Sequence, residues 1–176
     1  MEKTLKSIAM NYGLYLGLAL TLTTVLVYAT NLDIFVKWQF SIALFLLVLI
    51  VGFISITKAK KAQGGFISFK EAFTSFFITV AVGTIISSVV GLIIFTIVDP
   101  EAAEQLNEKI LIATKESMER FGAPDETIKE QLAKARDKDN FSIGTTLTNY
   151  VIGLVIYSIF GLIGAAIFKK KNADQD

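Results

Sequence analysis

The sequence contains no cysteine and no histidine. The absence of cysteine excludes disulfide bonds and thiol nucleophiles, and the absence of both residues excludes the usual ligand sets of zinc. Without histidine, a hydroxyl nucleophile also has no imidazole base to activate it. We therefore expect no catalytic residue, no metal site and no cofactor, and we predict that the protein is not an enzyme.

Charged residues are absent from four long windows, each of which exceeds or equals the roughly 20 apolar residues that cross a hydrocarbon core about 30 Å thick. These windows are residues 7–32, 38–57, 72–98 and 140–168. Because the bilayer core offers no water, each segment must satisfy its own backbone hydrogen bonds as a helix. The alternation that is typical of a transmembrane β-barrel is absent.

The sequence therefore predicts an all-α integral membrane protein with four transmembrane helices in a single membrane domain, residues 1–176. The predicted spans are about 8–29, 39–57, 72–98 and 145–168. The first apolar run is longer than the core of a signal peptide, so we expect an uncleaved anchor.

The distribution of charge predicts the orientation of the spans. The net charge of +1 gives no reason to expect nucleic-acid binding. Nine of the seventeen basic residues lie before the first span, between spans two and three, or after the fourth. The positive-inside rule therefore places both termini and the 58–71 loop in the cytoplasm and residues 99–139 outside. We expect this insert, with eleven acidic and seven basic residues, to be an extracytoplasmic helical hairpin.

The stretch QGGFISFKEAF, residues 63–73, is predicted to be a cytoplasmic turn and a helix start. We expect the second helix to end near Thr57 and the chain to reverse at Gly64 and Gly65. Ser68 and Glu71 have the spacing of a capping box. The third helix then begins with Phe69 as an aromatic anchor at the membrane boundary, and we expect its first one or two turns to lie along the membrane surface.

Lys58, Lys60 and Lys61 precede this turn and are candidate contacts for anionic lipid head groups. The alternative, which we prefer, is that they only set the topology.

The insert at 99–139 begins with helix-start signals, because Asp99 suits the N-cap position and Pro100 the first helical position. Two short amphipathic helices are predicted before and after Gly122 and Pro124. The apolar stripe of the first includes Leu106 and Ile110 and ends at Phe121. Helices this short need packing to persist, and these stripes have three candidate partners: each other, the membrane or another protein.

Small residues recur at interface spacing within the spans, and they allow close helix packing in lipid. They are Gly13 and Gly17, then Gly83, Ser87 and Gly91, and finally Gly161 and Ala165. The polar residues of the spans are of the Thr, Ser, Asn and Tyr types. We expect them to hydrogen-bond within or between helices, and a polar permeation path is the less favoured interpretation.

The segment GGFISFKEAF at 64–73, followed one span later by VDPE at 98–101, resembles the bacterial membrane-protein family catalogued as domain of unknown function 4199. The resemblance covers nearly the whole chain. It implies a four-span protein of the bacterial inner membrane with no assigned activity, and it supplies no catalytic residues.

The sequence is compatible with three classes of function. The favoured hypothesis is a non-catalytic membrane protein whose hairpin, residues 99–139, meets a protein partner or the bilayer surface. A small transporter or an oligomeric channel subunit is the alternative, although ionisable residues, which usually mark ion paths, are absent from the spans. An enzyme ranks last, because carboxylate pairs such as Glu101 and Glu104 also occur on ordinary solvated helices.

Overall fold

The computed structural model describes residues 2–136 and 138–170, and this part of the chain is helical apart from its connections and one isolated β-bridge. The α-helices are α1 (Glu2–Thr30), α2 (Trp38–Ala62), α3 (Phe69–Ile93), α4 (Pro100–Arg120), α5 (Asp125–Arg136) and α6 (Ile143–Phe168). A 3-10 helix, η1 (Leu32–Val36), precedes α2, and a π-helical turn, η2 (Ile94–Val98), continues α3.

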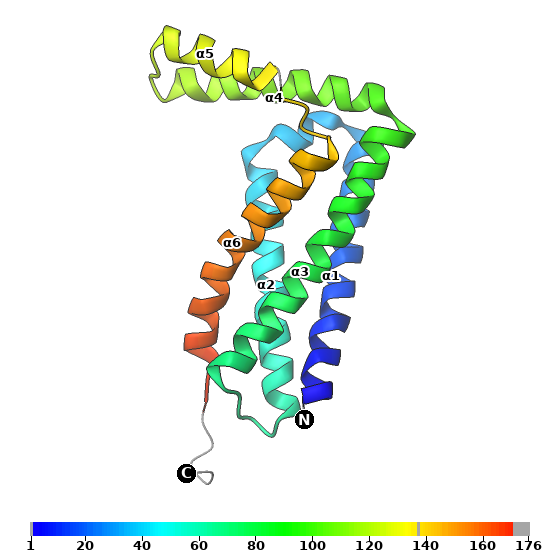
Figure 1. The fold of residues 1–176 in the computed structure, drawn as a ribbon, viewed down its shortest axis with the longest axis vertical. Coiled ribbons are helices and arrows are strands. Elements are labelled where there is room, and N and C mark those ends of the chain that lie inside the picture. Colours follow the sequence, from blue (N-terminus) through cyan, green and yellow to red (C-terminus); the bar gives the residue numbers. More distant parts are fainter. Residues whose placement is uncertain (1, 137, 171–176) are drawn as a thin grey trace.

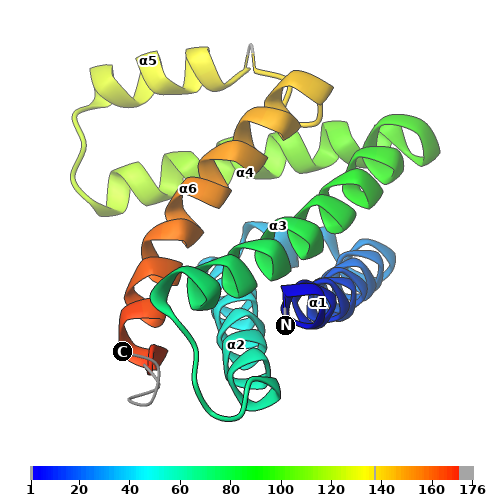
Figure 2. The same ribbon diagram turned by 60° about the horizontal axis from the view of Figure 1, so that its bottom comes forward.

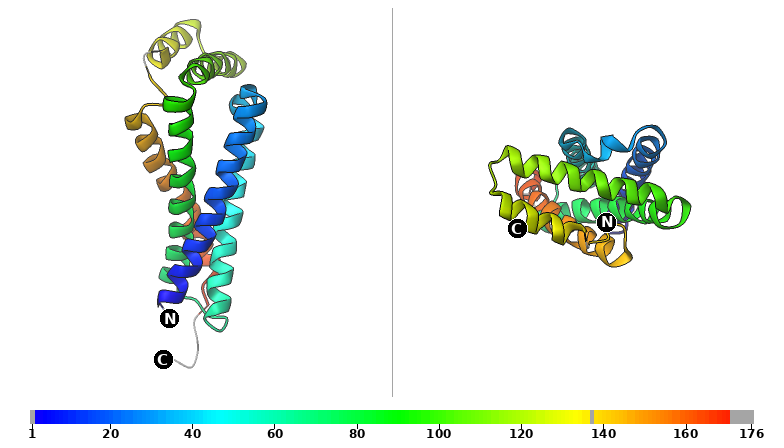
Figure 3. Two further views of the ribbon diagram at one scale, coloured as in Figure 1. Left: turned by 90° about the vertical axis from the view of Figure 1, so that its right-hand side faces the viewer. Right: turned by 90° about the horizontal axis from the view of Figure 1, so that it is seen from above.

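Four helices are long and apolar enough to cross a membrane: α1 from Leu5, α2, α3 with η2, and α6. They run side by side as a bundle, and α4 and α5 lie across one end of it (Figures 1 and 3). We call this the hairpin end. The start of α1 and the end of α6 lie at the opposite end (Figure 1). Within the bundle α3 is central, since it contacts α1, α2 and α6.

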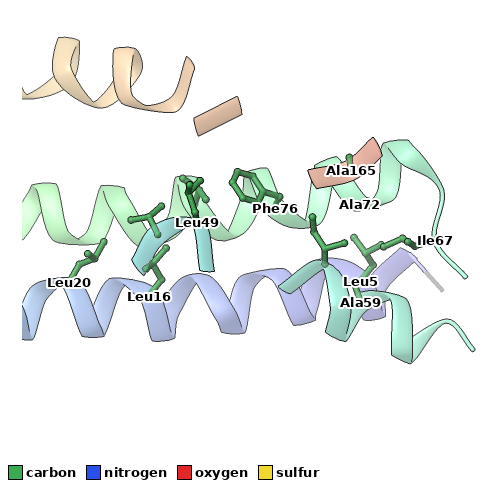
Figure 4. Close-up of a cluster of buried hydrophobic side chains, with 12 residues drawn as sticks. Leu5, Leu16, Leu20, Leu49, Ala59, Ile67, Ala72, Phe76 and Ala165 are labelled. Carbon is green, nitrogen blue, oxygen red and sulfur yellow. The ribbon is translucent and has the colours of Figure 1, made fainter. Parts of the chain in front are cut away.

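The apolar core lies mainly in the half of the bundle away from the hairpin, where Leu5, Ala59, Ile67, Phe76 and Ala165 meet from five parts of the chain (Figure 4). Close approach depends on small residues. A side chain at Gly13 would collide with Val82 and one at Gly83 with Leu16, so the predicted small-residue positions do join α1 to α3. Gly91 is the exception, because it faces open space.

One expectation for the approach to the third span is wrong. The second helix does not end near Thr57 but continues to Ala62, because its last turns are packed: Ala59 is fully buried. The first turns of α3 pack within the bundle, where Ala72, Ser75 and Phe76 are fully buried, and their position relative to a membrane surface stays a prediction. Helix α3 runs obliquely past α1 as one continuous helix (Figure 1).

Helices α3 and α6 diverge toward the hairpin end of the bundle. Figures 2 and 3 show α6 close to α3 where α3 begins and separated from it at the hairpin end. The close half is held by Phe76, whose ring contacts the backbone position of Gly161. This divergence places a hollow between the two helices beneath the hairpin.

Candidate functional site

The GGFISFKEAF segment forms the turn and the helix cap that lead into α3, at the end of the bundle opposite the hairpin. Gly64 and Gly65 have φ angles of +75° and +93°, which side chains rarely adopt. The predicted capping box is present: the Ser68 hydroxyl accepts from the Glu71 amide at 3.2 Å, and the Ser68 amide donates to the Glu71 carboxylate at 2.8 Å. Phe69, the first residue of α3, is exposed.

The residue before this cap ties the turn to the last helix. Ile67 is buried, and its backbone exchanges two hydrogen bonds with Lys170, at 3.0 and 2.9 Å. The predicted motif therefore joins the start of α3 to the end of α6, a pairing that no local spacing in the sequence indicates.

The three lysines of the α2 terminus differ in their surroundings. The ammonium group of Lys60 donates to the carbonyl oxygen of Phe168 at 2.8 Å, which caps the C-terminus of α6. Lys58 and Lys61 are exposed. Contact with lipid head groups remains a prediction for these two side chains, whereas Lys60 is already engaged by the protein.

Asp99 stands at the corner between η2 and α4. One carboxylate oxygen accepts from the Ala102 amide at 3.0 Å, as the N-cap prediction requires, and Pro100 is the first residue of α4. The other oxygen accepts from the hydroxyl of Tyr28 on α1 at 2.8 Å. The Ala102 amide, and then the Tyr28 hydroxyl, hold the pKa of the Asp99 carboxyl below its ordinary value.

The first half of α4 is docked onto the end of the bundle. Ala102, Ala103 and Leu106 are buried in one cluster with Ile94 and Phe95 of η2. The stripe residue Leu106 therefore faces the bundle and is unavailable to another protein.

Polar contacts reinforce this docking. The ammonium group of Lys109 forms an ion pair with Asp33 of η1. The side-chain amide of Asn140 donates to Asn107 at 2.8 Å, which ties the segment before α6 to α4. In α5, Ile128 is buried and the helix packs against α4. The two amphipathic stripes thus close largely on the bundle and on each other, while Phe121 at the end of α4 is 86% exposed.

The polar residues of the spans fall into two groups. Ser55, Ser75 and Thr79 are fully buried, and the Thr79 hydroxyl lies 2.7 Å from that of Ser55 and 3.0 Å from the carbonyl oxygen of Ala9. These contacts join α1, α2 and α3, as expected for interhelical hydrogen bonding. By contrast, Ser88 and Asn149 have no side-chain hydrogen bond within the described residues.

At least three hollows lie beneath the hairpin. One, of about 370 Å³, lies where α3 and α6 diverge, and its lining includes Ser88, Asn149 and Tyr150. The second, of about 670 Å³, lies between α4 and the start of α2. Among the described residues, no three acidic side chains gather in an arrangement that would hold a metal ion. The sequence missed these hollows because they depend on how whole helices cross.

Comparison with known proteins gives one match. Residues 11–170 match the model of a family described as a protein of unknown function, DUF4199. No curated protein and no solved structure matches the chain.

Proposed function

Because the chain belongs to the DUF4199 family, whose description assigns no activity, we propose a function from the geometry of its hairpin. The protein is a non-catalytic, multi-pass protein of the bacterial inner membrane. It holds the α4–α5 hairpin outside the bilayer, with both termini in the cytoplasm. The hairpin is a docking element for a protein partner.

One observation carries this proposal: the hairpin is fixed across the end of the bundle, and its acidic outer side is left exposed. Glu104 and Glu108 lie two residues before and after the buried Leu106, so at about 100° per residue they project away from the bundle. A surface that is held still loses little conformational entropy when it binds. Its acidity favours a partner with a basic surface.

The distribution of charge supports the orientation. The exposed Lys58, Lys61 and Lys169 lie at the end of the bundle opposite the hairpin. Short basic segments are retained on the cytoplasmic side of a membrane. The hairpin would then lie on the other side.

Single-cysteine variants test this orientation, because the native chain has no cysteine. Glu108→Cys and Lys61→Cys place a thiol at exposed positions at the two ends. We expect a membrane-impermeant maleimide to label position 108 in intact cells and position 61 only after permeabilisation. Labelling of both positions from the same side would overturn the proposed topology.

Charge reversal tests the docking role. We expect the Glu104→Lys, Glu108→Lys double variant to lose the proteins that co-purify with the native chain after mild solubilisation. The neutral Gln pair should lose them partly. Lys115→Glu is the matched control, because it adds negative charge two turns after Glu108 on the same side of α4. Retention of the same partners by the double Lys variant would contradict a docking role for this face.

Transport of a small solute is a second candidate function, and the hollow between α3 and α6 supports it. Polar groups without partners are costly in an apolar surrounding, so the unpartnered side chains in this hollow favour a polar occupant. If Asn149 and Ser88 line a path for a small solute, Asn149→Leu should reduce flux into liposomes that contain the purified protein. The absence of flux for every solute and ion tested would remove support for transport.

A further inference from the structure

The larger hollow under the hairpin lies where a lipid head group would be if α2 crosses a bilayer. It has a volume of about 670 Å³ and lies between the second half of α4 and the beginning of α2. Trp38, the first residue of α2 and the only tryptophan of the chain, lines it and is 63% exposed. Tryptophan is enriched at the level of lipid head groups.

Three charged side chains line this hollow. Lys37 immediately precedes α2, and Arg120 lies in the last turn of α4. Glu116 stands one turn before Arg120. None of the three has an ion pair within residues 2–136 and 138–170. The hollow therefore offers two cations and one anion that the described chain leaves uncompensated.

An apolar surface begins at this hollow and runs along α2. Trp38, Ile42, Leu46 and Ile50 follow one another at intervals of four residues, so they share one side of the helix. They are between 46% and 63% exposed, and within the bundle no other helix covers them. An acyl chain could lie along this ridge while its head group remains in the hollow.

We propose that the hollow is a binding site for a phospholipid whose head group carries a primary ammonium, such as a phosphoethanolamine lipid. The phosphate lies between Lys37 and Arg120, the ammonium donates to Glu116, and an acyl chain follows the exposed ridge of α2. The site rests on the proposed function in one respect, which is that the hairpin lies at the outer face of the membrane.

The charge arrangement selects this head group over two others. An anionic head group such as phosphoglycerol pairs with the two cations but offers Glu116 only neutral hydroxyl donors, which bind a carboxylate more weakly than an ammonium does. A choline head group places methyl groups against Glu116, and these cannot donate the charge-assisted hydrogen bond that a primary ammonium makes. The phosphoethanolamine head group satisfies all three side chains.

The single tryptophan makes the site directly measurable. The purified full chain in detergent micelles is titrated with phospholipids that carry bromine near the head of the acyl chain, and quenching of Trp38 fluorescence is followed. We expect brominated phosphoethanolamine lipid to quench at several-fold lower mole fraction than the phosphocholine or phosphoglycerol lipid. Equal quenching by the three lipids would overturn the proposal.

Variants assign the roles. Lys37→Gln and Arg120→Gln should each weaken the phosphoethanolamine lipid by about tenfold, since a hydrogen bond to a charged group is worth about 1.5 kcal/mol or more. Glu116→Gln should remove the preference over phosphoglycerol while leaving the latter bound. Lys115→Gln is the matched control, because it removes one charge from the opposite side of α4, and it should change nothing. Lipid selectivity that persists in all three site variants would overturn the assignment.

This experiment separates the two proposals. It needs no protein partner and no defined orientation, since the protein is in micelles. Equal quenching by the three lipids rejects only the lipid site, whereas retention of all co-purifying proteins by the Glu104→Lys, Glu108→Lys variant rejects only the docking role.

Discussion

The ring of Phe76 on α3 is held between two glycines on neighbouring helices, and this contact gives a sharp prediction of stability. Phe76 is fully buried. A Cβ atom added at Gly52 on α2 would lie 2.5 Å from one edge of the ring, and one added at Gly161 on α6 would lie 2.6 Å from the other edge. The closest ordinary contact of a Cβ atom is about 3.4 Å, so alanine at either position requires a displacement of roughly 1 Å.

The ring cannot move away from either glycine without approaching the other, because the two glycines lie at opposite edges. Overpacking of a close-packed interior costs about 1–3 kcal/mol. Alanine gains about 0.5–1 kcal/mol over glycine from helix propensity. We therefore expect Gly52→Ala and Gly161→Ala each to lower the free energy of unfolding by about 0.5–2 kcal/mol, the overpacking cost less the propensity gain.

Unfolding of the purified protein by added SDS, followed by circular dichroism, measures this change. Gly153→Ala is the matched control for Gly161→Ala, because Gly153 also lies on α6 and a Cβ atom there meets nothing within 4 Å. This variant should leave the stability unchanged or raise it. Phe76→Leu should reduce the penalty of Gly161→Ala in the double variant, because the two sites are in contact. If Gly161→Ala and Gly153→Ala unfold alike, the reasoning is refuted.

Three further predictions follow from other contacts. Hydrogen bonds from Ala102 and Tyr28 lower the pKa of Asp99 in the folded state. The carboxylate therefore stabilises the fold above the ordinary carboxyl pKa, and this stabilisation is lost as the pH falls through the folded-state pKa. Acidification should lower the melting temperature of the native chain more than that of the Asp99→Asn variant. Thr79→Val should cost about 0.5–1.5 kcal/mol in SDS unfolding, because it removes the hydrogen bond that its buried hydroxyl donates, whereas Thr79→Ser should cost less. Gly65→Ala should cost about 1–2 kcal/mol in the same assay through backbone strain alone, and an unchanged midpoint would contradict the positive φ angle.

The parts of the fold that sequence alone predicts are those with short-range causes. A capping box requires two residues three positions apart, so Ser68 and Glu71 were recognisable, and the Asp99–Pro100 start of α4 is equally local. A charge-free window reports the apolar length of a segment rather than where its helix ends. For this reason the sequence predicts that α2 stops near Thr57, although the lysines that follow are compatible with several further helical residues.

Long-range pairings leave no comparable trace in one sequence. Tyr28 and Asp99 are 71 residues apart, and neither has a neighbour that indicates the other. Gly52 belongs to no small-residue motif, yet it meets Phe76 as closely as Gly161 does. An amphipathic stripe likewise indicates that one side of a helix is covered, but it does not indicate which element covers it. The sequence therefore does not predict that Leu106 packs on η2.

The polar residues of α3 lie in two different environments, although they look alike in the sequence. Thr79 lies in the closed half of the bundle, where its hydroxyl has protein acceptors on α1, α2 and its own helix and nothing further to gain from a ligand. Ser88, more than two turns along the same helix, faces the hollow together with Asn149 of α6, and neither side chain has a partner in the described chain. A carboxamide in an apolar surrounding must be hydrogen-bonded or pay for its desolvation. Water, a solute or a second chain must therefore meet Asn149 if the span is in a membrane, and this makes it the first residue to remove when transport is tested.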